Sequence, residues 1–359
     1  MTRGVVYAEP GAAPVVEEIV LDPPGPHEVQ VRIEACGLCH TDVHVVETGG
    51  WGMPFPILLG HEGAGIVEEV GPEVASVQPG DRVVVAWRAP CGKCRACKRG
   101  DPRRCSSALR AKPRAHRAAD GAVLAAVLRC GTFADRTVVH EACAVKVPVE
   151  LPVEQAALLA CGFSTGAGAA LWSTPVREGA IVAVIGCGGV GLAVVQGAKL
   201  AGAERIVAVD VAAEKLESAR ALGATDVVDA SAGDPVEQVR ELTRGVDFAF
   251  SAIGAAAGLD QAVRMCAYGG TATLVGVPSE GAVLGADLYR DVFGPKVAIA
   301  VTHGGDTIPQ EDFPFLAQAA LDGRLDLARF VSRTLPLEEV PDALGHLGQN
   351  GEIRAVALL

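Results

Sequence analysis

The stretch IVAVIGCGGVGLAVVQGAKLAGAERIVAVD, residues 181–210, contains the strongest fold signal in the chain. A short apolar run precedes the spacing Gly186-x-Gly188-x-x-Gly191, and a longer apolar run of helical length follows it. A lone GxGxxG is weak evidence, but a strand before it and a helix after it are the context of a dinucleotide-binding turn. In that turn Gly186 permits the tight bend, Gly188 lets the backbone approach a pyrophosphate, and Gly191 lets helix and strand pack closely.

The residues around this turn predict how a coenzyme is held. The helix that begins at Gly189 and Val190 offers backbone N–H groups and a positive dipole end to phosphates. Asp210 follows Gly191 by 19 residues and ends the next strand, where a carboxylate accepts both hydroxyls of an adenosine ribose. Lys215, further along, also comes within reach of the ribose. Because Asp210 would repel a 2′-phosphate, we expect NAD(H) rather than NADP(H); the alternative is a glycine turn in the core with a surface acid.

Composition limits the function classes. The chain has 359 residues, half of them hydrophobic, and a formal net charge of −12. This length predicts about two domains, and the acidic balance argues against nucleic acid or an anionic membrane as a partner. The amino terminus shows no apolar leader, and the glycine cluster explains the long apolar stretch 180–202 better than a membrane span does. We therefore expect a soluble, cytoplasmic protein whose thiols stay reduced.

The apolar pattern changes near residue 152. Before it, short strands alternate with turns, as in 28–35, where every second residue is apolar; this predicts a small antiparallel barrel or sandwich. After it, six short apolar runs with helical segments between most of them predict a doubly wound parallel sheet, so the fold class is α/β. About the last 55 residues continue neither pattern.

Four cysteines lie in one basic loop, with the spacing Cys91-x2-Cys94-x2-Cys97-x7-Cys105. In a reducing compartment such a cluster binds metal more often than it forms disulfides. Iron–sulfur ligation is a weaker alternative, because the last gap is wide and no proline follows Cys105. A redox role needs a βαβ context that the loop lacks. Four thiolates suit a closed tetrahedral zinc site, which leaves no position for substrate, so we expect this zinc to be structural.

A second group of polar residues indicates a catalytic metal. Cys39, His40, Thr41, Asp42 and His44 fall within six positions, and His61-Glu62 follows in a glycine-flanked turn. Taken singly, each histidine is more often structural than a ligand. Together they offer the thiolate, imidazole and carboxylate ligands of a catalytic zinc, which needs three protein ligands and one open position. A third ligand must come from elsewhere, and Cys161 is best placed.

The order of these motifs resembles that of the zinc-containing medium-chain alcohol dehydrogenases, nearly from end to end. The resemblance rests on Cys39, GHE at 60–62, the four-cysteine loop, CGFSTGAGAA at 161–170 and GCGGVG at 186–191. The CGFSTGAGAA segment is most similar to class III, the glutathione-dependent formaldehyde dehydrogenases. Segments such as DGAVLAAVLRCGTFADRTVV at 120–139 are similar to their mycothiol-dependent relatives.

The resemblance implies an architecture and residue roles. It implies a GroES-like catalytic domain over 1–162, to which 302–359 returns, and a Rossmann NAD-binding domain over 163–301. It implies two Zn²⁺ per chain, NAD(H) and a homodimer or homotetramer. The roles that it implies are Cys39, His61 and Cys161 as catalytic zinc ligands, Glu62 behind the metal, Asp42 orienting His61, Thr41 and His44 as a proton relay, and His40 and Arg354 on the coenzyme pyrophosphate.

The expected reaction is hydride transfer between an alcohol and NAD. Zinc would stabilise the alkoxide form of the alcohol, and in reverse would polarise the carbonyl. Trp51 and Phe55 favour an apolar or aromatic substituent, so a primary or aromatic alcohol competes with an S-hydroxymethyl thiol adduct. One alternative is a biosynthetic reductase of the same fold acting on a C=C or iminium bond, which ranks second because Thr41 and His44 are both present. The other is a non-catalytic scaffold, which the full set of ligands argues against.

Overall fold

The computed structural model describes residues 2–348 and 351–359, which form two compact units. The first unit comprises 1–161 and 308–359, and the second comprises 162–307. No helix within the described residues is long and apolar enough to span a bilayer. Each unit is described by itself below.

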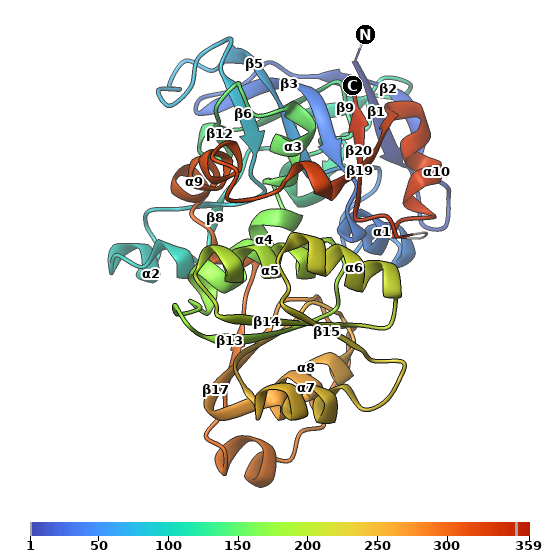
Figure 1. The fold of residues 1–359 in the computed structure, drawn as a ribbon. Coiled ribbons are helices and arrows are strands. Elements are labelled where there is room, and N and C mark those ends of the chain that lie inside the picture. Colours follow the sequence, from blue (N-terminus) through green and yellow to red (C-terminus); the bar gives the residue numbers. More distant parts are fainter. Residues whose placement is uncertain (1, 349–350) are drawn as a thin grey trace. The chain divides into compact units, whose positions relative to one another are not determined.

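The second unit is built on a parallel sheet whose residues are all described (Figure 1). Its six strands include all six of the apolar runs noted in the sequence, so the predicted doubly wound sheet is confirmed. In spatial order they are β15 (Asp226–Asp229), β14 (Arg205–Asp210), β13 (Ile181–Ile185), β16 (Val246–Ser251), β17 (Cys266–Leu274) and β18 (Ala298–Val301).

Helices cover both faces of this sheet. On one face α5 (Gly189–Leu200) packs against α6 (Ala213–Leu222), and on the other face α7 (Pro235–Thr243) packs against α8 (Ala256–Met265) (Figure 1). The sequence sets some of the ends directly: the Asp234 carboxylate caps one helix by accepting from the Val236 N–H at 2.8 Å, with Pro235 in its first turn. The helices are α4 (Gly162–Gly168), α5 (Gly189–Leu200), α6 (Ala213–Leu222), α7 (Pro235–Thr243) and α8 (Ala256–Met265), with the π-helical turns η4 (Ala169–Ser173) and η5 (Leu288–Phe293).

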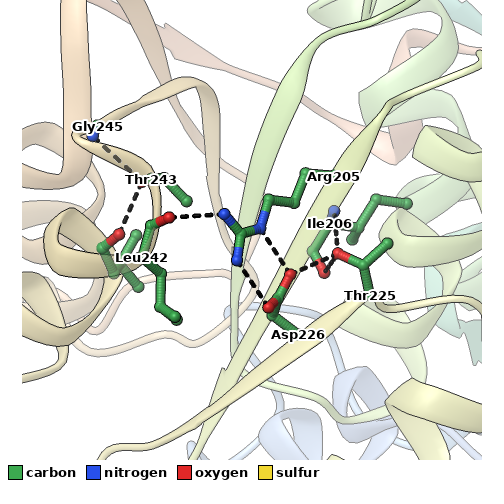
Figure 2. A network of polar contacts seen from close by, with 8 residues as sticks. Arg205, Ile206, Thr225, Asp226, Leu242, Thr243 and Gly245 are labelled. Atoms are coloured by element: carbon green, nitrogen blue, oxygen red, sulfur yellow. Dashed lines mark hydrogen bonds and ion pairs between the residues drawn. The ribbon is translucent and has the colours of Figure 1, made fainter.

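A polar network joins the amino ends of β14 and β15 to the end of α7 (Figure 2). The Arg205 guanidinium donates to both oxygens of Asp226 at 2.7 and 2.8 Å and to the Leu242 carbonyl at 2.6 Å. Thr225 also donates to Asp226. The hydrogen bond from Arg205 is the largest influence lowering the pKa of Asp226 to about 2. This network links the amino ends of two adjacent strands to the last turn of α7.

The first unit contains two larger sheets and one short hairpin among the described residues. The alternation in 28–35 is real, since Val29, Val31, Ile33 and Ala35 are all buried. Sheet one runs β10 (Ala125–Ala126), β4 (Ile57–Leu58), β1 (Thr2–Tyr7), β2 (Val15–Leu21), β9 (Ala115–Arg117). Sheet two runs β12 (Ala144–Lys146), β6 (Arg82–Val85), β5 (Glu62–Val70), β3 (Glu28–Gly37), β20 (Arg354–Leu358), β19 (Val331–Pro336), and β11 (Arg136–His140) also pairs with β3. The hairpin is β7 (Ala89–Pro90) with β8 (Ala108–Leu109).

Pairing in the first unit is mostly antiparallel, with two exceptions. β10 lies parallel to β4 and β19 lies parallel to β20, which the alternating pattern did not predict. The end of the chain returns to the first unit, because β20 pairs antiparallel with β3 between Val356 and Gly37. The helices of this unit include α1 (His40–Glu47), α2 (Arg95–Lys98), α3 (Val153–Leu158), α9 (Pro309–Leu321) and α10 (Val340–Leu344).

Candidate metal and coenzyme sites

Four possible metal ligands from three parts of the sequence meet in the first unit. Cys39 caps the start of α1, His61 immediately precedes β5, Glu62 is the first residue of β5, and Cys161 ends the segment after α3. One ligand atom from each lies within 4.8 Å of all the others. Residues separated in sequence by more than a hundred positions therefore form one cluster.

The imidazole of His61 is held in a fixed orientation. Its Nδ1 lies 3.0 Å from the Oδ2 of Asp42, and both side chains are fully buried. The other Asp42 oxygen accepts from the Gly60 N–H at 2.8 Å. The Nε2 of His61 is buried and has no oxygen or nitrogen partner among the described residues. A carboxylate on one nitrogen and an unsatisfied second nitrogen are the arrangement of a metal-ligating histidine.

Charge in this cluster favours a divalent cation. Burial lowers the pKa of His61, but the Asp42 carboxylate and the Cys39 thiolate together raise it well above its usual value. The Cys161 thiol donates to Cys39, and this hydrogen bond is the largest influence lowering the pKa of Cys39. The pair of thiols thus shares one proton. A Zn²⁺ ion replaces such protons, so the residues fit the metal that the sequence predicts.

Arg354 supplies positive charge beside the same cluster. Its side chain is 8 % exposed, and its guanidinium lies 3.6 Å from a Glu62 oxygen and donates to the Leu38 carbonyl at 2.8 Å. Sequence reasoning assigned Arg354 to the coenzyme pyrophosphate and missed its contact with Glu62. In the sequence, the one feature that could have indicated this contact with Glu62 is an arginine at the start of the apolar run of β20. Contact with a pyrophosphate stays a prediction for Arg354, as it does for the exposed His40.

Two of the predicted relay residues lie on α1. The Thr41 hydroxyl is 3.7 Å from the Cys39 sulfur, so the structure brings it to the metal cluster. His44 lies one turn later, is about half exposed and has Glu47 at 3.8 Å. The helix therefore starts at a ligand and leads towards solvent, but a proton path along it stays a prediction.

The four cysteines of the basic loop form the second cluster. Their sulfur atoms all lie within 4.8 Å of one another, and Cys94 and Cys105 are 3.9 Å apart. A disulfide needs about 2.05 Å, whereas two thiolates at 2.3 Å from a tetrahedral zinc lie about 3.8 Å apart. The 3.9 Å separation of the two sulfurs therefore fits zinc ligation and not a disulfide.

Backbone N–H groups in this loop donate hydrogen bonds to the cysteine sulfurs and so favour their thiolate form. The Cys91 N–H donates to the Cys105 sulfur and the Cys94 N–H donates to the Cys91 sulfur, each at 3.3 Å. Backbone N–H groups of Cys97 and Ser106 lower the pKa of Cys94 to about 5. Burial and the neighbouring thiols raise the pKa of Cys97 to about 12. Four neighbouring thiols, which hinder one another's ionisation, are the donor set of a structural zinc. Cys91, Cys94, Cys97 and Cys105 would hold that zinc.

The glycine-rich turn of the second unit lies between β13 and α5. Gly186 has a φ of +88°, and a Cβ at Gly191 would lie 1.7 Å from the Gly186 carbonyl oxygen, so both need glycine for the fold. A Cβ at Gly188 would meet no described atom within 4 Å. Protein packing therefore does not explain Gly188, and the close approach of a phosphate group to its backbone stays a prediction.

Asp210 lies beside this turn, as predicted from its spacing. Its Oδ2 accepts from the Cys187 N–H at 2.7 Å, and its Oδ1 accepts from the N–H groups of Val211 and Ala212 at 2.8 and 3.0 Å. The carboxylate is thus fixed at the carboxyl end of β14, next to the glycine motif. Lys215 is half-buried in the first turn of α6.

Comparisons with known proteins place both units in one family. Residues 25–149 match the alcohol dehydrogenase GroES-like domain, and residues 189–320 match the zinc-binding dehydrogenase family. An S-(hydroxymethyl)glutathione dehydrogenase from Photobacterium damsela subsp. piscicida is 36% identical over 99% of this chain and 99% of its own. The chain belongs to the zinc-containing medium-chain alcohol dehydrogenases. The expected α/β class, with a GroES-like and a Rossmann domain, is confirmed.

Solved structures of alcohol dehydrogenases superpose closely on this chain. An alcohol dehydrogenase zinc-binding domain protein from Burkholderia ambifaria superposes with a TM-score of 0.94 at 35% identity, covering 100% of this chain and 98% of that one. Benzyl alcohol dehydrogenase from Acinetobacter calcoaceticus gives 0.92 at 30% identity, covering 100% and 99%. This dehydrogenase is accordingly a zinc-dependent alcohol oxidoreductase, and NAD(H) is consistent with its family.

Proposed function

We propose that this dehydrogenase oxidises a primary alcohol to its aldehyde with NAD⁺ and catalyses the reverse reduction. The observation that carries the proposal is the Thr41 hydroxyl, 3.7 Å from the Cys39 sulfur in a cluster fit to hold zinc. Zinc bound by Cys39, His61 and Cys161 would supply the Lewis acidity that makes an alcohol acidic near neutral pH. Thr41 accepts the proton of the alcohol and passes it towards His44, while the carbinol hydride goes to the nicotinamide.

The substrate class follows from polar and apolar groups at α1 and the turn after it. A hydroxyl beside the metal cluster suits an alcohol or aldehyde, whereas reduction of a C=C or iminium bond has no oxygen-bound proton for Thr41 to take. Trp51, about half exposed, and the half-buried Phe55 favour an apolar or aromatic substituent. The relatives named S-(hydroxymethyl)glutathione dehydrogenase and benzyl alcohol dehydrogenase support the two alternatives, a thiol adduct and an aromatic alcohol.

A direct assay tests this function. Purified protein is mixed with NAD⁺ and a panel of benzyl alcohol, aliphatic primary alcohols, and formaldehyde adducts of glutathione and of mycothiol, and NADH absorbance is followed. We expect turnover of at least one primary alcohol or adduct. If no compound of the panel leads to NADH formation, but the protein reduces an enone or an iminium with NADH, the proposal is contradicted and the biosynthetic reductase is favoured. No turnover by fully zinc-loaded protein in either direction would favour the scaffold alternative.

Coenzyme choice is predicted from Asp210. A 2′-phosphate beside this fixed carboxylate would bring like charges together in a partly enclosed site. We expect kcat/KM to favour NAD⁺ over NADP⁺ by about a hundredfold or more, since each 1.4 kcal/mol is tenfold. Asp210→Gly should narrow this ratio at least tenfold. Asp229→Asn, at the end of the neighbouring strand, is the matched control and should leave the ratio nearly unchanged. Equal use of both coenzymes by the unaltered protein would refute the assignment.

We also propose that the protein is a homodimer formed through the second unit. β18 is the edge strand of its sheet, and Val301 on it is 58 % exposed. Nearby in sequence, Tyr289 and Phe293 stack at 5.9 Å and are each more than three-quarters exposed. Exposed edges and large apolar patches are typical of association surfaces. A second copy would cover both.

Sedimentation measurements test this dimer. Val301→Lys places a charge on the edge strand and should convert the protein to a monomer at micromolar concentration. Val149→Lys, at an exposed valine of the first unit, is the control and should stay dimeric. A dimer that survives Val301→Lys combined with Phe293→Asp would exclude this edge as the interface.

The proposed compartment is the cytoplasm. None of the eleven cysteines, all of them among the described residues, forms a disulfide, and six of them belong to the two clusters suited to zinc. Such clusters are stable where thiols are kept reduced.

A further inference from the structure

A cavity separate from the coenzyme turn lies within the second unit. Its volume is about 490 Å³, within the range of small-molecule sites. It is formed by α7, α8, η5 and the start of β17. Because the strands are parallel, Cys266 at the start of β17 lies at the opposite sheet edge from Gly186, which follows the end of β13. The cavity is therefore at the amino edge, together with the network of Figure 2.

Three arginines and one carboxylate line the cavity. Asp291 accepts from the Arg290 guanidinium at 2.8 and 3.1 Å and from the Asp287 backbone N–H at 2.9 Å, and the Arg264 guanidinium lies 3.4 Å from it. One carboxylate thus holds two guanidinium groups. Arg240 donates to the carbonyls of Arg264 and Cys266 at 3.0 and 3.1 Å, which leaves its charge without a neutralising partner among the lining residues. The lining has an excess of two positive charges.

Apolar and aromatic surface completes the lining. Among the lining residues, Val263 and Cys266 are buried and Tyr268 is 77 % exposed. A guanidinium presents a planar set of donors that matches phosphate oxygens. An exposed tyrosine ring offers a face for a planar group. The cavity therefore combines a site for an anionic head with a site for an apolar, flat body.

We propose that this cavity is a second ligand site, which binds a phosphate monoester with an aromatic body. A phosphate monoester carries a charge of about −1.5 to −2 at neutral pH, which matches the excess of two arginines. Asp291 contacts both Arg264 and Arg290, whose remaining N–H groups contact the phosphate oxygens, and the aromatic body lies against Tyr268. The site is separate from the coenzyme turn, because the glycine motif lies at the opposite edge of the same sheet.

The test uses the intact, zinc-loaded protein saturated with NADH, so that the coenzyme site is filled. Phenyl phosphate is titrated by calorimetry. We expect saturable binding of one molecule per chain, weaker binding of inorganic phosphate, and no detectable binding of phenol. In the double variant Arg264→Gln with Arg290→Gln, affinity should fall about a hundredfold, since each charged hydrogen-bonding group contributes about tenfold.

Matched variants separate a specific site from general attraction. Arg220→Gln removes an exposed arginine on α6 that does not line the cavity, and should leave the affinity unchanged. Arg264→Lys keeps the charge but loses the planar donor set, and should weaken binding about tenfold. The proposal is overturned by absence of saturable binding, by full affinity in the double variant, or by an equal loss in Arg220→Gln.

Discussion

Thr41→Ala is expected to lower kcat by about 10²–10⁴-fold, the usual contribution of general acid–base catalysis. The Thr41 hydroxyl lies 3.7 Å from the Cys39 sulfur, so its removal takes away the proposed proton acceptor beside the candidate metal cluster. Alanine is a good helix former, and Thr41 is in the first turn of α1, so the fold should persist. Steady-state rates over a range of pH, with the melting temperature and zinc content of each variant, measure the effect.

Thr48→Ala is the matched control for this experiment. Thr48 ends the same helix, where its hydroxyl donates to the His44 carbonyl at 2.6 Å. Its loss should reduce stability slightly and leave kcat within about twofold, as surface changes usually do. Normal kcat in a well-folded, zinc-loaded Thr41→Ala protein would remove the main support for an alcohol or aldehyde substrate. In that case Thr41 would be a helix-end residue with no part in catalysis.

Cys105→Ser should produce the largest loss of stability. The backbone N–H of Cys91 and the sulfur of Cys94 both contact the Cys105 sulfur, so this residue joins the two ends of the loop. Losing a structural metal belongs to the few changes that cost about 4 kcal/mol or more, which corresponds to a fall in melting temperature of about 10 °C. Zinc per chain, measured on purified protein, should fall from two to one.

The activity of folded Cys105→Ser protein distinguishes a structural from a catalytic metal. We expect kcat per folded molecule to stay within about twofold, because four protein ligands leave no position for substrate. Cys143→Ala is the control: its thiol is buried in the same unit but belongs to neither cluster, so zinc content should stay at two. Unchanged stability and zinc content in Cys105→Ser would exclude the structural site.

The amino-acid sequence by itself determined the features that depend on local spacing. The four cysteines fall within fifteen residues, so chain connectivity alone keeps their sulfurs close enough to share a metal. Gly186 and Gly191 need glycine because of the adjacent turn and helix, which is also a local requirement. The central strands β13, β14 and β16 of the second unit are nearly continuous apolar runs, since a parallel sheet covered on both faces buries the strands at its centre.

Only the tertiary structure decided which distant residues meet. Cys39, His61 and Cys161 come together because α1, β5 and the segment after α3 converge, and no short-range pattern encodes that convergence. The contact of Arg354 with Glu62 depends on β20 pairing with β3 across most of the chain. β19 gave no sequence signal, because most of its side chains are exposed and it joins the sheet by pairing with β20. Spacing along the chain specifies local ligand sets, whereas sheet pairing places the buried charges around them.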